Sequence, residues 1–107
     1  QANYLESFRF ITAMSTNYGL DGVGYQGAYA YDAVMLVEAA LEQALTFGIP
    51  TDDVTNLRYA LRDALIGMPS HKGAAAVYDY KDNDKIGVDP YSLLLAKVVN
   101  GVLTPLQ

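Results

Sequence analysis

The side chains of this 107-residue chain that could do chemistry are mainly carboxylates, and one group of them lies in a turn. Asp79, Asp82 and Asp84 have a spacing that could suggest a calcium loop. Counted from Asp82, an EF-hand would find its glycine at Gly87, but Leu93 stands where the loop needs a bidentate glutamate. We therefore predict a solvated turn that holds no metal.

A second group of carboxylates lies along a helix-forming stretch. Glu38 and Glu42 are four residues apart and share a helix face, whereas Asp32 lies six residues before Glu38 and does not. A catalytic pair would also need a pocket that perturbs one pKa. We predict a solvated acidic edge for the two glutamates. Asp32 stands among Tyr29, Tyr31 and small residues, which favours a structural hydrogen-bonding role.

Nucleophiles and metal ligands are scarce. His71 is the single histidine and there is no cysteine, so zinc ligation is not expected. Ser70 and His71 are adjacent in sequence, a spacing that does not give the geometry of a catalytic triad. Gly22–Gly24 lacks the third glycine and the preceding strand of a dinucleotide fingerprint. We predict a loop position for His71, and neither an enzyme nor a cofactor.

Composition points to a surface that meets other protein. Hydrophobic residues make up 51% of the chain and charged residues 18%, below the usual quarter. The alternative is an ordinary apolar-rich small domain. The net charge is −5, with seven acids against Arg9 in residues 1–57 and six Lys or Arg against five acids in residues 58–107. No basic patch interleaved with aromatic residues is present, which argues against a nucleic-acid partner.

Helix formers and helix-ending residues predict three helices, at about residues 4–18, 27–47 and 52–66. Asn3 with Glu6 resembles a capping box, and Gly19 is placed to end the first helix. The second helix includes an apolar stretch without Gly or Pro, Ala28–Leu45, and Gly48 is predicted at its C-cap. Apolar stripes are predicted on all three helices, at Tyr4, Phe8, Ile11, Met14 and Tyr18, at Ala30, Ala33, Val34, Val37, Ala40, Leu41, Ala44 and Leu45, and at Val54, Leu57, Leu61 and Leu65.

After the helices, the hydrophobic period changes to that of strands, predicted at about residues 74–80, 91–99 and 102–105. Asn100-Gly101 is a strong signal for a two-residue hairpin between the last two strands. Leu93–Leu95 is apolar on both faces, as in a strand inside a larger, doubly covered sheet. The central helix is likewise too apolar for one small sheet to cover. The chain therefore reads as part of a bigger α/β body.

Four stretches in this order resemble the C-terminal portion of the type I periplasmic solute-binding proteins, the extracytoplasmic receptors of ABC importers for branched-chain amino acids and related small solutes. They are YLESFRFITAMSTNYG, AYAYDAVMLVEAALEQA with its Tyr-Asp-Ala motif, DVTNLRYALRDAL, and GAAAVYDYKDNDKIGVDPYSLLLAKVVNG. There are two departures from the family pattern: Asn83 stands where a glycine is expected beside Asp84 in the turn, and Ser70–Lys72 stands where a second glycine usually precedes the strand. The match covers nearly the whole chain.

The resemblance implies a longer protein of two α/β lobes that close on a ligand across a hinge. It implies a periplasmic or extracellular location, a permease as protein partner, and an amino acid or related small solute as ligand. From this segment, Tyr25 and Gln26 would touch the ligand, and most other pocket residues would lie outside the chain. The alternative for Tyr25 is a surface loop residue that packs on the first helix.

Two other functions stay open at the level of sequence. A small α+β interaction domain could self-associate through its apolar helix and an exposed strand edge. A ligand-sensing receptor domain could use the same fold without transport.

Overall fold

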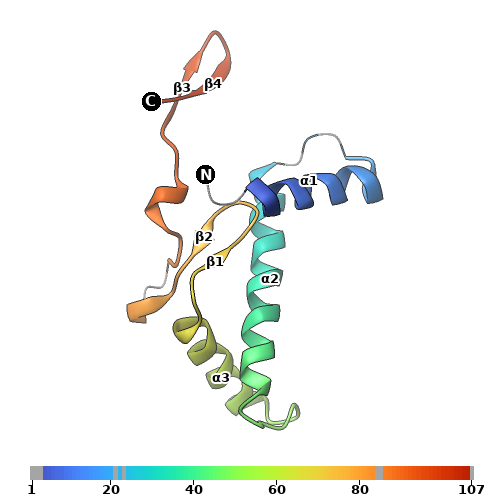
Figure 1. Ribbon diagram of the computed structural model, residues 1–107, viewed down its shortest axis with the longest axis vertical. Helices are drawn as coiled ribbons and strands as arrows, with labels where there is room; N and C mark the ends of the chain where they lie inside the picture. Colours follow the sequence, from blue (N-terminus) through green and yellow to red (C-terminus); the bar gives the residue numbers. More distant parts are fainter. Residues whose placement is uncertain (1–3, 21, 23, 84–85, 107) are drawn as a thin grey trace.

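The structure is a computed structural model that describes residues 4–20, 22, 24–83 and 86–106. Three helices are followed by short strands and a hairpin, so the predicted mixed α/β order is confirmed (Figure 1). The helices and strands are α1 (Tyr4–Tyr18), α2 (Tyr25–Leu45), α3 (Val54–Gly67), β1 (His71–Lys72), β2 (Val77–Tyr78), β3 (Ala96–Val99) and β4 (Val102–Pro105). Short 3₁₀ turns occupy Lys81–Asn83 and Pro90–Ser92.

The helix ends follow their capping residues. Gly19 ends α1 in a left-handed conformation (φ 64°), and its N–H donates to the Ser15 carbonyl at 2.9 Å. Asp53 caps α3 by accepting a hydrogen bond from the Asn56 N–H at 3.3 Å, so α3 begins at Val54 and not at residue 52. α2 begins and ends two residues earlier than predicted, and its C-cap is Thr46 rather than Gly48. The predicted cap at Asn3 lies outside the described residues.

α2 and α3 pack through small residues. Ala40 and Ala44 on α2 and Ala60 and Ala64 on α3 are buried together, which lets the two helices approach closely. Four larger apolar side chains pack half-buried against this cluster, at Ile49, Leu57, Leu61 and Leu65. The predicted face of the third helix was therefore right except at Val54, which is 51% exposed.

The prediction that the apolar stripe of the first helix forms its core face was wrong. Phe10 is the buried residue of α1, and its ring lies 5.1 Å from that of Tyr31. Phe8 and Ile11 are more than half exposed because α1 runs across one end of α2, and only part of its surface lies against the rest of the described chain (Figure 1). The central helix behaves similarly: it buries Leu36 and two alanines, while Val34 and Val37 stay exposed.

The strand predicted at 74–80 was wrong except at β2. β2 pairs antiparallel with β1, with His71 opposite Tyr78, so His71 is a strand residue and not a loop residue. In the turn between them, the N–H groups of Ala74 and Ala75 donate hydrogen bonds to the side chain of Asp32. These two N–H groups therefore cannot pair with a neighbouring strand.

The strand predicted at 91–99 was also shorter than expected. Asp89 caps a 3₁₀ turn at Pro90–Ser92, and Leu93–Leu95 has no regular structure, so only β3 remains. β3 and β4 form the predicted hairpin, with Val99 opposite Val102. Asn100 (φ 50°) and Gly101 (φ 80°) both take the left-handed conformation that a two-residue type I′ turn requires. The strands form two separate pairs rather than one sheet.

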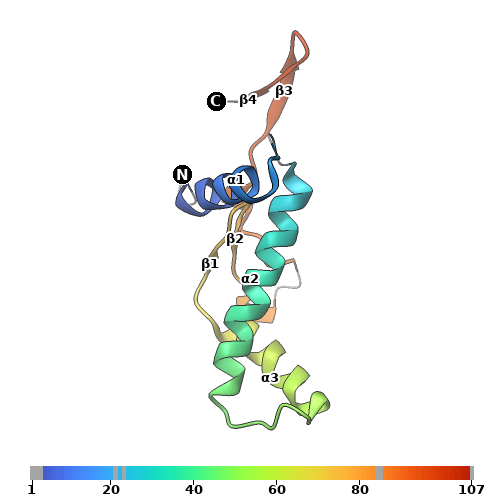
Figure 2. The same cartoon turned by 90° about the vertical axis from the view of Figure 1, so that its right-hand side faces the viewer.

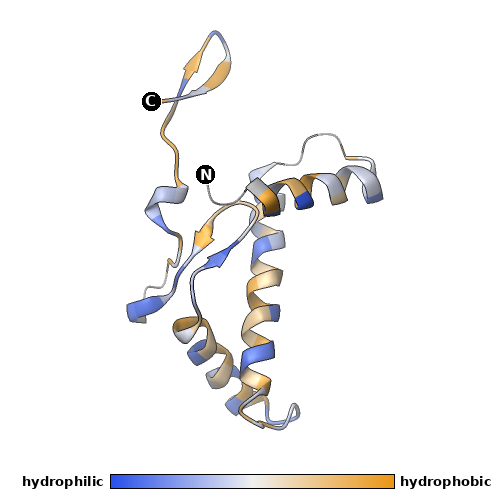
Figure 3. Ribbon diagram, viewed as in Figure 1, coloured by the Kyte–Doolittle hydropathy of each residue, from blue (hydrophilic) through white to orange (hydrophobic). Residues whose placement is uncertain are grey.

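The chain is extended for its size. Its radius of gyration is 16.7 Å, where a folded domain of this length has about 13 Å. Its accessible surface is 8090 Å², where a folded monomer of 11.6 kDa exposes about 5,800 Å². In Figures 1 and 2 the β3–β4 hairpin stands away from the helices, and Figure 3 shows that its strands are largely hydrophobic. Much apolar surface is thus uncovered, as the sequence predicted. No helix in the described part of the chain is long and apolar enough to cross a bilayer.

Candidate functional site

The predicted ligand-binding residues lie at the first turn of α2, not in the loop before it. Gly24 is the N-cap and offers no side-chain cap, and the first intrahelical bond runs from the Gly27 N–H to the Gly24 carbonyl at 3.1 Å. The N–H groups of Tyr25 and Gln26 precede that bond and point out of the positive end of the helix. Both side chains are exposed. This end of α2 can therefore accept an anionic or carbonyl group from outside.

Tyr25 is oriented by its own helix. Its ring meets that of Tyr29 edge-on, with centroids 6.5 Å apart and planes at 81°. Tyr25 nevertheless keeps 70% of its surface exposed. The side-chain oxygen Oε1 of Gln26 lies 3.0 Å from the position that a Cβ on Gly24 would take. The side-chain amide of Gln26 therefore folds back over the start of α2. An aromatic wall and an amide thus flank the free N–H groups.

Asp32 anchors α2 to the β1–β2 turn. Its carboxylate is fully buried, and Oδ1 accepts a hydrogen bond from the Ala74 N–H at 2.5 Å. Oδ2 accepts from the Ala75 N–H and from the Tyr78 hydroxyl, both at 2.8 Å. Two successive backbone N–H groups form a nest for the negative charge. The predicted structural role is confirmed. The anchor lies seven residues after Tyr25, about 10 Å along the helix.

Three neighbours complete the anchor. A side chain at Gly73 would overlap the Asp32 carboxylate, so only glycine fits there. The pKa of the Tyr78 phenol is raised above its ordinary value. Burial is the main cause, and the hydrogen bond to Asp32 is the second. Ser7 on α1 donates to the carbonyl of Ala74 at 2.5 Å and ties α1 to the same turn. The sequence showed Asp32 but not these partners, which lie more than forty residues away or on another helix.

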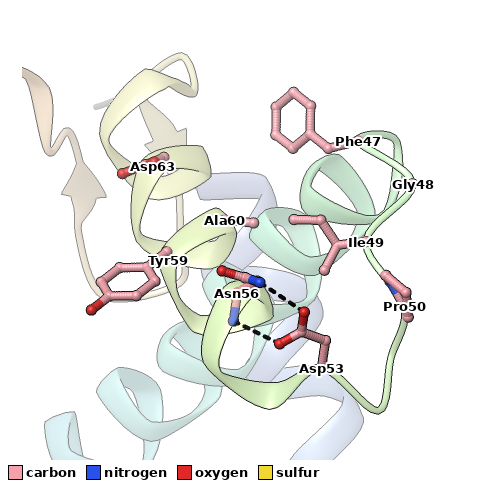
Figure 4. Close-up of a pocket in the computed structure, with 9 residues that line it drawn as sticks. All are labelled: Phe47, Gly48, Ile49, Pro50, Asp53, Asn56, Tyr59, Ala60 and Asp63. Carbon is pink, nitrogen blue, oxygen red and sulfur yellow. Dashed lines mark hydrogen bonds between the residues drawn. The ribbon is translucent and has the colours of Figure 1, made fainter.

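The turn between α2 and α3 holds a groove of about 570 Å³ that sequence reasoning missed (Figure 4). The rings of Phe47 and Tyr59 border it and are each more than half exposed. Its two carboxylates are already paired, since Asp53 accepts from Asn56 and Asp63 accepts from the neighbouring Arg62. It lies at the opposite end of α2 from the first turn, about 30 Å away. These features suit a small polar solute less well than the first turn of α2.

The other candidates fall into structural positions. Asp79 accepts from the Lys81 N–H at 3.0 Å, and Asp82 is exposed in a left-handed conformation (φ 58°), while Asp84 lies outside the described residues. Among the residues that the structure describes, no group of His, Cys, Asp and Glu could hold a metal ion. Glu38 and Glu42 are both exposed, as predicted.

A solved structure shares this fold over almost the whole chain. It is an extracellular ligand-binding receptor from Rhodopseudomonas palustris, with a TM-score of 0.78 and 23% sequence identity. The alignment covers 98% of this chain and 29% of the receptor's chain. Comparisons with protein-family models and with curated proteins find no match. The chain thus has the fold of a segment of a ligand-binding receptor, and spans 29% of that receptor's length.

Proposed function

We propose that this chain is a segment of an extracytoplasmic receptor that captures an amino acid or amide-like solute for an ABC importer, without catalysis. The observation that carries the proposal is the fold it shares with a ligand-binding receptor along 98% of its length. The four sequence stretches that resemble the type I solute-binding proteins support it independently. The receptor would be two-lobed, periplasmic or extracellular, and would deliver its solute to a membrane permease.

In this proposal the first turn of α2 faces the solute. The free N–H groups of Tyr25 and Gln26 bind a carboxylate or amide oxygen, and the positive end of the helix favours negative charge there. The Tyr25 ring covers the apolar part of the solute. Asp32 holds α2 against the β1–β2 turn, so that the first turn keeps its place when the lobes close on the solute.

Calorimetric titration of the polypeptide that carries this segment, with a panel of L-amino acids and their amides, tests the proposal. Tyr25→Ala is expected to weaken binding by about tenfold to a hundredfold, since an aromatic wall contributes about 1–3 kcal/mol. Tyr59→Ala is the matched control, because Tyr59 is similarly exposed but lies on α3 beside the distant groove. Equal effects of the two substitutions, or no binding by the unsubstituted protein, would refute the proposal.

Gln26→Glu separates binding from stability. A carboxylate in the first turn stabilises a helix by about 0.3–1 kcal/mol, but it would repel the carboxylate of an amino acid. We expect a slightly more stable protein with a lower affinity for amino acids. Its affinity for their carboxyl-amidated forms should fall by less than its affinity for the free acids. Unchanged affinity for all ligands would place the solute away from α2.

A further inference from the structure

The turn of the β3–β4 hairpin carries a pair of residues that can react with each other. Asn100 is the one asparagine of the chain that a glycine follows. The side-chain carbonyl carbon of an asparagine and the backbone nitrogen of the next residue can close a five-membered ring, and glycine hinders this closure least because it has no Cβ. Asn100 and Gly101 are both exposed, and a Cβ placed on Gly101 would have nothing within 4 Å. Water and hydroxide can therefore reach the reacting atoms.

The reaction requires the hairpin to open. In a type I′ turn the left-handed backbone of Asn100 directs the Gly101 nitrogen away from the Asn100 side chain. Opening costs little free energy, because β3 and β4 pair with each other alone and an isolated two-stranded hairpin is marginally stable in water. Figures 1 and 2 show the hairpin clear of the helices, so within the described part of the chain its own pairing is what resists opening.

We propose that Asn100 is a site of spontaneous deamidation that converts this turn to isoaspartate. The Gly101 nitrogen gives its proton to hydroxide and attacks the side-chain carbonyl carbon of Asn100. The new C–N bond closes a succinimide ring, while the amide nitrogen of Asn100 takes up a proton from water and leaves as ammonia. Water then adds to one of the two ring carbonyls and breaks its bond to the nitrogen. The products are isoaspartate and aspartate, and each carries a carboxylate where the amide was.

The isoaspartate product cannot keep the register of the hairpin. Its main chain runs through the former side-chain carbonyl, which adds one carbon atom to the loop between Val99 and Val102. These two residues are directly opposite each other, and the two-residue loop between them fixes the register of both strands. A longer loop breaks this pairing. Because the ammonia is lost, refolding does not restore the turn.

Two other asparagines provide controls within the same molecule. Asn17 lies in the last turn of α1, and Asn56 lies in the first turn of α3 with its side-chain amide bonded to Asp53 at 2.7 Å. Ring closure at either one needs local unfolding of a helix and an attack by the nitrogen of a bulky following residue. We expect deamidation to be at least about tenfold slower at each than at Asn100, the ratio that about 1.4 kcal/mol of extra opening free energy would give.

Incubation of the 107-residue chain at mildly alkaline pH, followed by peptide mapping with mass spectrometry, tests the proposal. Asn100 should convert first, to both products, and faster as the pH rises because hydroxide takes part. Concentrated urea should accelerate the reaction strongly at Asn56 but only about twofold at Asn100, since a hairpin with an opening free energy near zero is already open about half of the time. Equal acceleration at the two sites would show that the folded hairpin protects its turn, and would overturn the inference.

Gly101→Ala separates hindered attack from a tighter turn. The added methyl group crowds the attacking nitrogen, and we expect deamidation at Asn100 to slow by about tenfold or more. Alanine is disfavoured at the φ of 80° found here, so the substitution loosens the hairpin, which by itself would speed the reaction.

Val102→Ala is the matched control, because it loosens β4 without touching the reacting pair and should not slow the reaction. Equal rates in Gly101→Ala and the unsubstituted chain, or conversion of Asn17 or Asn56 before Asn100, would also overturn the inference. None of these outcomes bears on solute binding at α2.

Discussion

Replacement of the buried Asp32 carboxylate by an amide should destabilise the chain strongly. The carboxylate accepts three hydrogen bonds, from the Ala74 and Ala75 N–H groups and from the Tyr78 hydroxyl. In Asp32→Asn, one side-chain oxygen becomes an NH₂ group. In either orientation of the amide, one backbone N–H then faces a donor and loses its partner.

The size of the effect follows from these three bonds. An orphaned buried N–H costs about 1–3 kcal/mol, and each remaining bond loses about 1 kcal/mol when its acceptor is no longer charged. Relief from burying a charge offsets part of this. We expect a net loss of about 2–4 kcal/mol in the free energy of unfolding, a large fraction of the 5–15 kcal/mol typical of a domain. The midpoint of thermal unfolding should fall by about 10–25 °C.

Urea denaturation followed by circular dichroism measures this loss. Glu42→Gln makes the same chemical change at an exposed position of the same helix and should shift stability by no more than about 0.5 kcal/mol. If Asp32→Asn matched Glu42→Gln while the native helix content was retained, the carboxylate would not be the anchor of the β1–β2 turn. Asp32 would then not hold the first turn of α2 in place either.

Three further predictions concern single contacts, each checked by the same denaturation assay. Gly73→Ala should cost about 1–3 kcal/mol because its methyl group would overlap Asp32, whereas Gly67→Ala has open space and should be neutral or stabilising. Tyr78→Phe should lower the free energy of unfolding by about 1 kcal/mol at neutral pH. Because the pKa of Tyr78 is raised in the folded chain, the difference between the two proteins should shrink as the pH rises above about 10. A difference that stays constant with pH would contradict this prediction. Asp53→Ala should cost about 0.5–2 kcal/mol through loss of the α3 cap, and Asp52→Ala, which removes no cap, should not.

The elements that the sequence predicted best have local causes. Gly19 and Asp53 mark helix ends through bonds to residues three or four positions away. The turn at Asn100-Gly101 fixes the hairpin register by backbone conformation alone. A lone aspartate among tyrosines and alanines indicated a structural hydrogen-bonding role before its partners were known.

The elements that failed depend on distant contacts. A run of alanines and aromatic residues has the pattern of a strand, but Asp32 draws the N–H groups of Ala74 and Ala75 out of the ladder. The stripe on the first helix is a correct amphipathic pattern, yet α1 meets the rest of the chain near Phe10 and leaves that stripe open. The groove at the α2–α3 turn arises from how two helices meet, which no spacing in the sequence encodes.

The most direct measurement of the central claim is amide hydrogen exchange along α2, with and without saturating solute. If the first turn faces the solute, exchange at the N–H groups of Tyr25 and Gln26 should slow on binding, and exchange around Phe47 and Tyr59 should not change. Protection confined to the α2–α3 turn, with the first turn of α2 unaffected, would contradict the account.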